Sequence, residues 1–255
     1  MGKSDAILAA KTPHLAEEVA VALVYNGSTH AVMMATPADL EDFARGFTLT
    51  EGIARPEDML DLEVVRHAQG IELRMWLPAP DAERLAGRRR AMAGPVGCGL
   101  CGIDSLEAAV TPAARVATDA LRLTPAEAKQ AVEMLRRRQP LHDATHAAHA
   151  AGLWRAGGLH LVREDVGRHN ALDKLVGGAR AAGAPGAGAA VVLTSRVSVE
   201  MVQKAAAYGA EAILAVSAAT SLAVDMAEAA GLTLVAGLKA GGVPRALTHP
   251  HRLEG

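Results

Sequence analysis

The amino-terminal part of the chain alternates apolar and polar residues in two stretches that predict β-hairpins. The first hairpin covers residues 18–36 and turns at Asn26-Gly27, a dipeptide that readily adopts the positive φ angles of a two-residue turn. The second covers residues 62–77 and turns at Gln69-Gly70. We therefore expect a lobe rich in β-hairpins in this part of the chain.

Helical spacing of apolar residues follows each hairpin. A stripe of apolar residues predicts a helix from Pro37 to about Leu49 and consists of Leu40, Phe43, Ala44 and Phe47. An arginine-rich helix is predicted over residues 80–91. Farther along, Thr124, Pro125 and Glu127 form the capping-box pattern that predicts the start of a helix over residues 124–138.

The pattern changes near residue 145, where short apolar strands begin to alternate with helices. We predict strands at 159–162, 189–193, 212–216 and 233–236, and helices at 171–182, 199–208 and 221–230. This alternation is typical of an α/β fold with a mostly parallel sheet, in which the strand-to-helix loops share one edge and often bind ligands. We expect an N-terminal lobe over residues 1–120, which includes the cysteine loop, and an α/β cofactor-binding core over residues 121–255.

Composition narrows the class of protein. A chain of 255 residues, half of them hydrophobic, can bury a sizeable core. A net charge of −2 and only two each of Phe, Trp and Tyr argue against binding of nucleic acid. The sequence shows no signal-peptide pattern and no apolar stretch near the roughly 18 residues that span a bilayer. We expect a soluble cytoplasmic protein with no membrane partner.

The two cysteines, Cys98 and Cys101, lie in a glycine-rich loop, Gly94-Pro95-Val96-Gly97-Cys98-Gly99-Leu100-Cys101-Gly102. The glycines leave the backbone free to expose sulfur. Asp104 and Ser105 begin a predicted helix, whose positive N-terminal end lowers the pKa of a nearby thiol toward about 3.5–7.5. A reactive thiol pair is one hypothesis; a zinc half-site and a pair of buried thiols are the alternatives.

Zinc chemistry fits the spacing poorly. His146 and His149 could complete four ligands with the two cysteines, but a predicted helix of fifteen residues separates the pairs. In addition, only two residues lie between these histidines, whereas three usually separate the histidines of a zinc finger. A zinc deaminase would need a His-x-Glu pair, which the sequence lacks, and a proline directly before the first cysteine, whereas Pro95 stands three residues ahead of it. We predict no metal site.

A charged loop over residues 163–174 joins a predicted strand to a predicted helix. Arg168 can bind phosphate oxygens with two hydrogen bonds, and His169 can transfer a proton near neutral pH. The alternative hypothesis is that Glu164, Arg168, Asp173 and Lys174 are surface charges and that Asn170 caps the helix.

Three further loops carry groups suited to an anion. Ser195, Arg196 and Ser198 lie between a strand and a helix, although Ser198 could simply be a helix cap. One strand later Ser217 and Thr220 repeat the arrangement, and the segment from Lys239 to Gly242 adds a cation and flexible backbone. Together these loops could line a cleft of nucleotide size.

The sequence resembles the FdhD family of formate dehydrogenase accessory sulfurtransferases over nearly its whole length. The resemblance is carried by residues 27–36, 50–53, 98–102, 164–174, 194–200, 217–220 and 248–250. It implies a cytidine-deaminase-like core without deaminase chemistry, and a homodimer. It also implies transfer of sulfur from a cysteine desulfurase to the bis-molybdopterin guanine dinucleotide molybdenum cofactor, which is then inserted into formate dehydrogenase.

The resemblance also implies roles for individual residues. Cys98 would carry sulfur as a persulfide, and Cys101 would assist its transfer or release. The cofactor-binding residues would be Ser195, Arg196, Ser217, Thr220, Arg168 and His169, together with the segment Gly237, Leu238, Lys239, Ala240, Gly241 and Gly242. No permanent cofactor is expected, because the molybdenum cofactor is the bound substrate.

Two positions depart from the family pattern. The family segment usually has Phe-x-Arg-x-Gly-Arg where this chain has residues 237–242, so an aromatic residue and an arginine are missing. His146 stands where the family has glycine, and it is strained if that position requires a positive φ angle. Two other function classes stay open: a non-catalytic chaperone that only holds the cofactor, and a zinc-dependent hydrolase or zinc-stabilised module.

Overall fold

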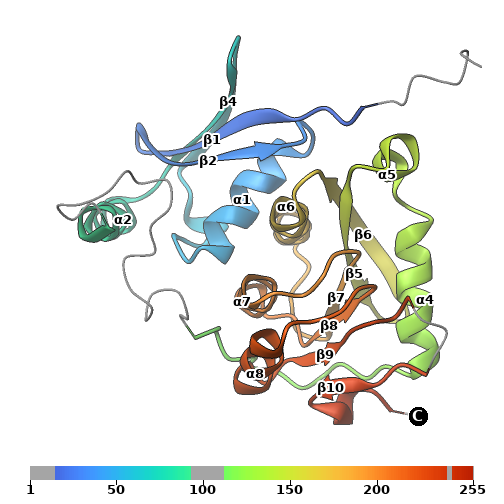
Figure 1. Cartoon of the computed structure of the whole chain (residues 1–255). Helices are drawn as coiled ribbons and strands as arrows, with labels where there is room; N and C mark the ends of the chain where they lie inside the picture. Colours follow the sequence, from blue (N-terminus) through green and yellow to red (C-terminus); the bar gives the residue numbers. More distant parts are fainter. Residues whose placement is uncertain (1–14, 93–111, 240–242, 255) are drawn as a thin grey trace, which may run out of the picture.

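The computed structural model describes residues 15–92, 112–239 and 243–254. A four-stranded mixed sheet forms the amino-terminal lobe, with strand order β2-β1-β4-β3 (Figure 1). Its strands are β1 (Val19–Tyr25), β2 (Ser28–Ala35), β3 (Asp61–His67) and β4 (Gly70–Trp76). β1–β2 and β3–β4 are antiparallel, which confirms both predicted hairpins, and β1 pairs with β4 in parallel.

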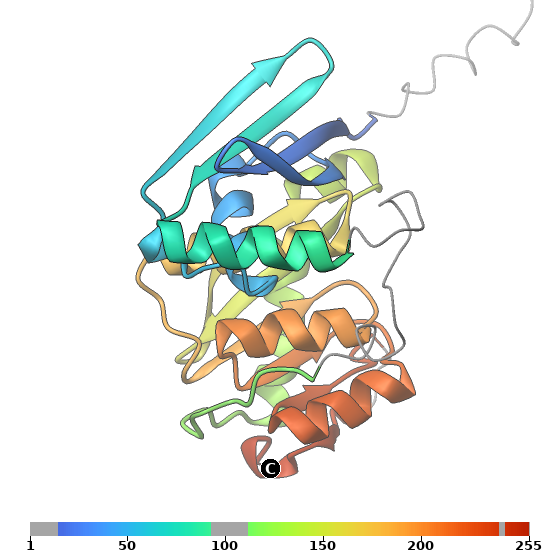
Figure 2. The same cartoon turned by 90° about the vertical axis from the view of Figure 1, so that its left-hand side faces the viewer.

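The turns of the two hairpins differ in how well the sequence predicted them. Asn26 and Gly27 form the first turn, with φ angles of 47° and 78°. The second turn lies at residues 68–69, one residue earlier than predicted, and Gly70 is the first residue of β4. Figure 2 shows the β3–β4 hairpin extending away from the rest of the molecule.

Two helices accompany this sheet. Helix α1 (Leu40–Thr50) packs its predicted apolar stripe against the sheet, and α2 (Ala79–Met92) follows β4 close to the predicted bounds. A short 3-10 turn (Pro56–Asp58) lies between α1 and β3. The prediction that α1 begins at Pro37 was wrong, because Asp39 has a left-handed backbone (φ 52°) that keeps the preceding residues out of the helix.

A six-stranded sheet with strand order β10-β9-β8-β7-β5-β6 forms the core. Its strands are β5 (His149–Arg155), β6 (Gly158–Asp165), β7 (Ala189–Leu193), β8 (Ala212–Ala215), β9 (Thr233–Val235) and β10 (Ala246–Thr248). Only β7–β8 and β8–β9 pair in parallel, and the other three pairs are antiparallel. The core sheet is therefore mixed and not mostly parallel as predicted. The four predicted strands run in one direction, but β5 and β10 were not predicted, and β5 lies antiparallel between β6 and β7.

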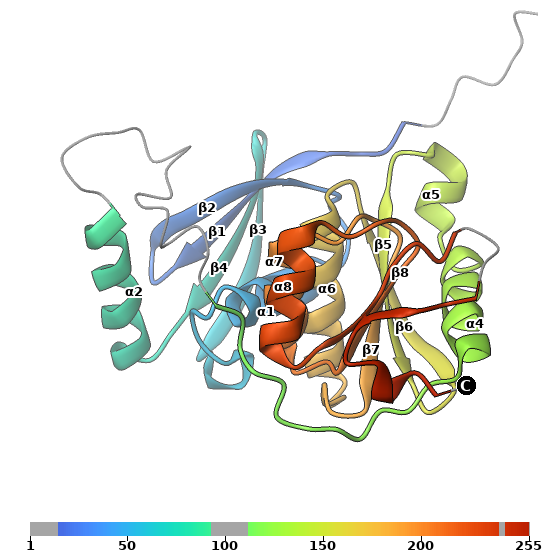
Figure 3. The same ribbon diagram turned by 60° about the horizontal axis from the view of Figure 1, so that its bottom comes forward.

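Helices cover both faces of the core sheet (Figure 3). Helices α6 (Arg168–Ala181), α7 (Val199–Tyr208) and α8 (Ser221–Ala230) pack on one face, and α4 (Pro125–Arg136) packs on the other. The predicted bounds of α7 and α8 are confirmed, and the capping box at Thr124 and Glu127 is present. A short helix, α5 (Pro140–Thr145), was not predicted and follows α4.

The lobe meets the core where α1 crosses α6. A Cβ atom added to Gly46 would lie 1.7 Å from the backbone oxygen of Asp173, and one added to Gly177 would lie 1.8 Å from that of Asp42. Only glycine allows the two helix backbones to approach this closely.

Farther along the chain, residues 112–123 run extended over the core, where the amide of Val116 donates to the carbonyl of Ala230. The domain boundary at residue 120 stays a prediction.

None of the helices in the described segments combines the length and the hydropathy needed to cross a membrane.

Candidate functional site

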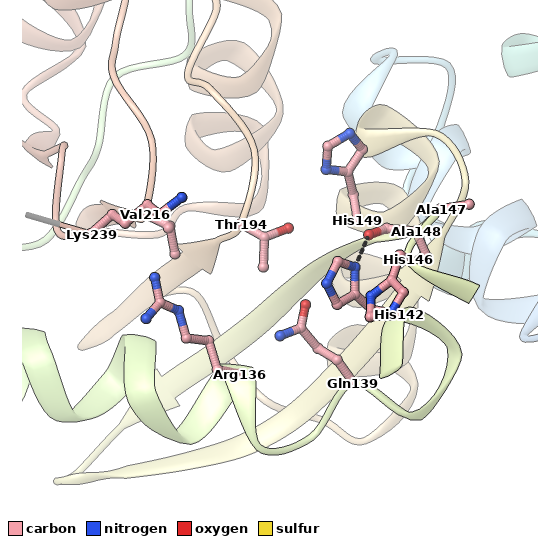
Figure 4. Close-up of a pocket in the computed structure, with 10 residues that line it drawn as sticks. All are labelled: Arg136, Gln139, His142, His146, Ala147, Ala148, His149, Thr194, Val216 and Lys239. Carbon is pink, nitrogen blue, oxygen red and sulfur yellow. Dashed lines mark hydrogen bonds between the residues drawn. The ribbon is translucent and has the colours of Figure 1, made fainter. Parts of the chain in front are cut away.

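A cavity of about 490 Å³ opens at the edge of the core sheet where β7, β8 and β9 end. Thr194, Val216 and Lys239, which follow these three strands, form one side of it (Figure 4). The opposite side comes from the end of α4, the α5 region and the start of β5. The residues that line the cavity are Arg136, Gln139, His142, His146, Ala147, Ala148, His149, Thr194, Val216 and Lys239.

The topology explains why these segments meet. The carboxyl ends of parallel strands share one edge of a sheet, and ligands of α/β proteins bind outside that edge. Because β5 is antiparallel to β7, its first residue, His149, lies at the same edge as Thr194. The amide of Ala150 donates to the Thr194 hydroxyl oxygen over 2.9 Å, which ties the two strands together beside the cavity.

The charged residues that line the cavity are cationic. Arg136 ends α4, and Lys239 lies beyond β9 on the other side of the opening. Neither side chain makes a hydrogen bond or ion pair with any residue in the described ranges, and no Asp or Glu is among the lining residues. Unpaired cations in a concave site concentrate anions there, so the cavity is suited to a phosphate-bearing ligand.

Three histidines form one wall of the cavity. The His142 Nδ1 atom lies 3.1 Å from the carbonyl oxygen of Ala148, and the His142 and His146 rings meet edge to face with centroids 5.5 Å apart. Across the parts of the chain that the structure describes, no three His, Cys, Asp or Glu side chains are placed to hold a metal ion. The wall therefore offers imidazole faces and edges to a ligand.

His146 has the left-handed conformation that the sequence comparison raised as a source of strain. It caps the carboxyl end of α5 with φ 54° and ψ 18°. A non-glycine residue in this region costs roughly 1–2 kcal/mol relative to the right-handed helical conformation. In return for this strain the cavity wall gains the imidazole of His146, whereas a glycine at this position would place no side chain there.

The predicted loop residues Arg168 and His169 lie beside this wall. Burial lowers the pKa of His149, and the nearby charges of Arg168, His142 and His169 lower it further. Burial also lowers the pKa of His169, although Glu200 opposes the shift with a carboxylate oxygen 2.8 Å from Nε2. Both imidazoles are therefore predominantly neutral at neutral pH, and each can accept a proton.

The charged loop is not simply a solvated surface. Lys174 and Asp165 form an ion pair of 2.6 Å with both side chains fully buried, which contradicts the surface-charge alternative for Lys174. Gly167, rather than Asn170, is the N-cap of α6. The Asn170 amide instead donates to the carbonyl of Met34 over 2.8 Å, across the junction with the lobe.

Glu164 has a structural role next to the cavity. Its two carboxylate oxygens accept the backbone amides of Leu141 and His142, each over 2.9 Å. These bonds satisfy amide groups at the start of α5 that have no partner within the helix. Glu164 therefore holds the turn that carries His142.

Comparison with known proteins identifies the family. The model of the FdhD/NarQ family matches residues 16–254. This chain belongs to the FdhD/NarQ family.

Individual relatives agree with this assignment. The chain is 50% identical over 242 residues to a protein of Cupriavidus necator named sulfur carrier protein FdhD, covering 94% of this chain and 83% of the relative. A protein of the same name from Agrobacterium fabrum is 50% identical over 86% of this chain and 82% of its own. A crystal structure described as that of a candidate formate dehydrogenase accessory protein from Desulfotalea psychrophila superposes with a TM-score of 0.69 at 28% identity, covering 94% and 91%.

Within this FdhD/NarQ chain, the predicted binding residues that the structure describes lie at the expected edge, but few of them line the cavity. Lys239 does. Ser195 and Ser217 each neighbour a lining residue; Ser195 is buried, and its hydroxyl donates to the carbonyl of Arg196 over 3.0 Å. The Thr220 hydroxyl accepts the amide of Ala223 and caps α8.

The rest of the predicted segment is only partly described. The amides of Gly237 and Leu238 donate to the carbonyls of Ser217 and Ala215, so both residues fill backbone positions beside β8. The exposed Arg196 side chain lies outside the cavity lining. Cys98 and Cys101, the predicted helix start at Asp104, and Ala240, Gly241 and Gly242 lie outside the described residues.

Sequence analysis missed Arg136, Gln139 and His142. Arg136 belongs to a run of three arginines at the end of α4, and the structure gives the three side chains different roles. Arg137 pairs with Glu133, Arg138 donates to a backbone carbonyl, and only Arg136 lines the cavity. No local pattern marks Arg136, Gln139 and His142 as a group, because α4 ends at Arg136 and a new helix begins at Pro140.

Proposed function

We propose that this chain is a sulfur carrier for formate dehydrogenase maturation. It takes persulfide sulfur from a cysteine desulfurase and transfers it to the bis-molybdopterin guanine dinucleotide molybdenum cofactor, which is the substrate held at the sheet edge. The names of the curated relatives support the sulfur-carrier role, and the spacing of Cys98 and Cys101 supplies the thiols.

The observation that carries the proposal is the cavity at the carboxyl ends of β7, β8 and β9. Within the described part of the chain, Arg136 and Lys239 have no side-chain partner there and no acidic residue lines the cavity. Its volume of about 490 Å³ suits one nucleotide-sized part of the cofactor. The phosphates of the substrate would lie against the two cations, because guanidinium and ammonium groups bind phosphate oxygens through charge-assisted hydrogen bonds.

Sulfur transfer requires only thiol chemistry. The thiolate of Cys98 attacks the outer sulfur of the desulfurase persulfide, the sulfur–sulfur bond of the donor breaks, and the donor cysteine leaves as a thiolate. Cys98 then holds the persulfide. Attack of the Cys101 thiolate on the inner sulfur of Cys98 would break the sulfur–sulfur bond of that persulfide, release the outer sulfur to the cofactor at the sulfide level and leave a Cys98–Cys101 disulfide, whose formation supplies the two electrons. The neutral His149 and His169 near the cavity can accept a proton while the cofactor is bound.

A maturation assay tests the proposal. Formate dehydrogenase would be activated in a strain lacking its own carrier, with the wild-type chain or with one of two variants. Arg136→Gln combined with Lys239→Gln should weaken cofactor binding by about tenfold or more, because two charge-assisted contacts are lost, but should leave persulfide formation intact. Cys98→Ala combined with Cys101→Ala should bind the cofactor and fail to activate the dehydrogenase.

The second candidate is a chaperone that holds the cofactor without carrying sulfur. The cationic cavity is compatible with it, because holding and sulfur transfer need the same binding site. Full dehydrogenase activation by the double cysteine variant would favour the chaperone and contradict the carrier. We also propose that the chain acts as a homodimer, which sedimentation of the purified protein would test.

A further inference from the structure

Gln139 is a buried side chain whose polar end has no partner in the described protein. Only 4% of its surface is exposed, and it lines the cavity. Its backbone carbonyl accepts the amide of Asp143 over 2.8 Å, which fixes the residue at the start of α5. Its side-chain amide makes no hydrogen bond with any described residue and does not cap the helix. In Figure 4 this amide points into the cavity between Arg136 and His142.

The stem of Gln139 is buried, and its carboxamide, which is not among the described side-chain atoms that are closed off without a partner, opens into the cavity. A ligand that displaces water from this amide has to replace the hydrogen bonds that the water made. The group presents one acceptor, Oε1, beside one donor, Nε2. Its geometric complement is a ring edge that places an N–H donor next to a carbonyl acceptor. Guanine and oxidised pterins both carry this lactam edge, so either ring could satisfy Gln139.

The neighbours of Gln139 divide the cavity into two ends. Arg136 and Lys239, which have no partner among the described residues, supply positive charge at one end, whereas the imidazoles of His142 and His146 lie at the other end (Figure 4). Phosphate groups belong with the cations, and a flat heteroaromatic ring belongs with the imidazole faces. Gln139 lies between these ends, within the part of the cavity that a ring attached to a phosphate chain would fill.

We propose that Gln139 recognises the lactam edge of the cofactor's ring, donating from Nε2 to the ring carbonyl and accepting the ring N–H at Oε1. The inference rests on the proposed function, because it assigns the ring end of the same substrate. It predicts that replacing Gln139 weakens binding of the ring and leaves binding of the phosphates unchanged, which no purely structural role of the residue would produce.

Calorimetric titration of the full-length chain tests this prediction. Guanosine diphosphate, its N1-methyl derivative and inorganic pyrophosphate would be titrated into the wild type and into Gln139→Met, which keeps the unbranched shape. Affinity for guanosine diphosphate should fall about 5- to 150-fold in the variant, the range for one bidentate base contact. Methylation of N1 blocks the same edge, so it should weaken binding to the wild type by a similar factor and have no effect in Gln139→Met.

Arg136→Gln is the matched control, because it should weaken guanosine diphosphate and pyrophosphate by the same factor. Gln139→Ala provides a second variant if the methionine variant melts at a lower temperature. A parallel titration with 6-hydroxymethylpterin separates the two rings: dependence on Gln139 for the pterin and not for the nucleotide would assign the contact to the pterin end.

Two outcomes overturn the assignment, and they have different consequences. Equal affinity of the wild type and both Gln139 variants for each ring would remove the role of Gln139 and leave the proposed function standing. Absence of nucleotide, pterin and pyrophosphate binding in the wild type would remove the substrate cavity itself, whereas persulfide formation on the cysteines would remain measurable by mass.

Discussion

Individual buried charges hold the amino-terminal lobe on the core. Lys204 donates from Nζ to Thr50 and Glu51, over 3.0 and 2.7 Å, and to both carboxylate oxygens of Asp173, over 2.9 and 3.0 Å. Burial alone would lower the pKa of Lys204, but the carboxylates of Asp173 and Glu51 outweigh it and raise that pKa. The lysine is therefore charged in the folded protein, and its charge is neutralised by Asp173 of α6 and by Glu51, the residue that follows α1.

Removing one partner of this pair should be costly. We predict that Lys204→Met lowers the free energy of unfolding by about 3–5 kcal/mol, because Asp173 would be left buried without its counter-charge. Urea denaturation measures this. Arg55→Ala, which removes an exposed ion pair with Asp58, is the control and should cost less than about 1 kcal/mol. Equal losses of unfolding free energy in Lys204→Met and Arg55→Ala would show that the buried ion pair stabilises the fold no more than an exposed one does.

His149 should make stability depend on pH in a definite direction. Its pKa in the folded chain is lowered from 6.5, so the unfolded chain binds a proton that the folded chain does not. Where the unfolded state binds more protons, stability rises with pH. We predict that the free energy of unfolding falls as pH drops through about 6.5 toward the lowered pKa, and that His149→Gln has a shallower pH dependence over this window. Denaturation curves from about pH 8 to pH 5 measure both slopes; identical slopes would contradict the prediction.

At the scale of elements, the caps of two neighbouring helices differ. The Thr220 hydroxyl accepts the amide of Ala223 and caps α8, whereas Ser198 at the start of α7 has no side-chain cap bond. We predict that Thr220→Ala costs about 1 kcal/mol of unfolding free energy and that Ser198→Ala costs a few tenths. Thermal or urea unfolding compares them. A larger loss of unfolding free energy for Ser198→Ala than for Thr220→Ala would contradict the assignment of Thr220, and not Ser198, as the side chain that caps its helix.

The crossing of α1 and α6 should tolerate no side chain. At Gly46 a Cβ would lie 1.7 Å from a backbone oxygen of α6, so the helices would have to separate. We predict that Gly46→Ala destabilises the protein by about 3 kcal/mol or more, at the upper end of overpacking effects. Arg45→Ala, on the more open side of the same helix, should cost much less. Urea denaturation of both variants measures these losses. An unfolding free energy of Gly46→Ala equal to that of the wild type would contradict the close approach of α1 and α6 at this position.

The sequence predicts elements well where the hydrophobic periodicity agrees with the turn and capping residues that bound an element. The hairpin at Asn26-Gly27, the capping box at Thr124, and helices α7 and α8 follow from local pattern alone. Strand β5 escaped prediction because its sequence, HAAGLWR, is rich in small residues and its five central residues are all buried, so it lacks alternation. Missing β5 also made the sheet look mostly parallel, because β5 lies antiparallel to both of its neighbours, β6 and β7.

For the whole molecule, the sheet edge was predictable and the cavity was not. The loops after β7, β8 and β9 converge as the alternating pattern predicts. The opposing wall depends on how α4, α5 and the start of β5 pack against those loops, a tertiary relationship that no local pattern encodes. Arg136, Gln139 and His142 therefore became site candidates only in the folded chain, whereas Lys239 was already one from the sequence.

The central claim is that this chain, with a cationic cavity at its sheet edge, carries sulfur on its cysteines. The most direct test is intact-protein mass spectrometry after incubation with a cysteine desulfurase and cysteine, comparing the wild type with Cys98→Ala and Cys101→Ala. The account predicts a gain of roughly 32 Da in the wild type, one sulfur atom as a persulfide, that is lost in Cys98→Ala. Absence of any gain in the wild type would contradict the carrier mechanism and leave a protein that only holds the cofactor.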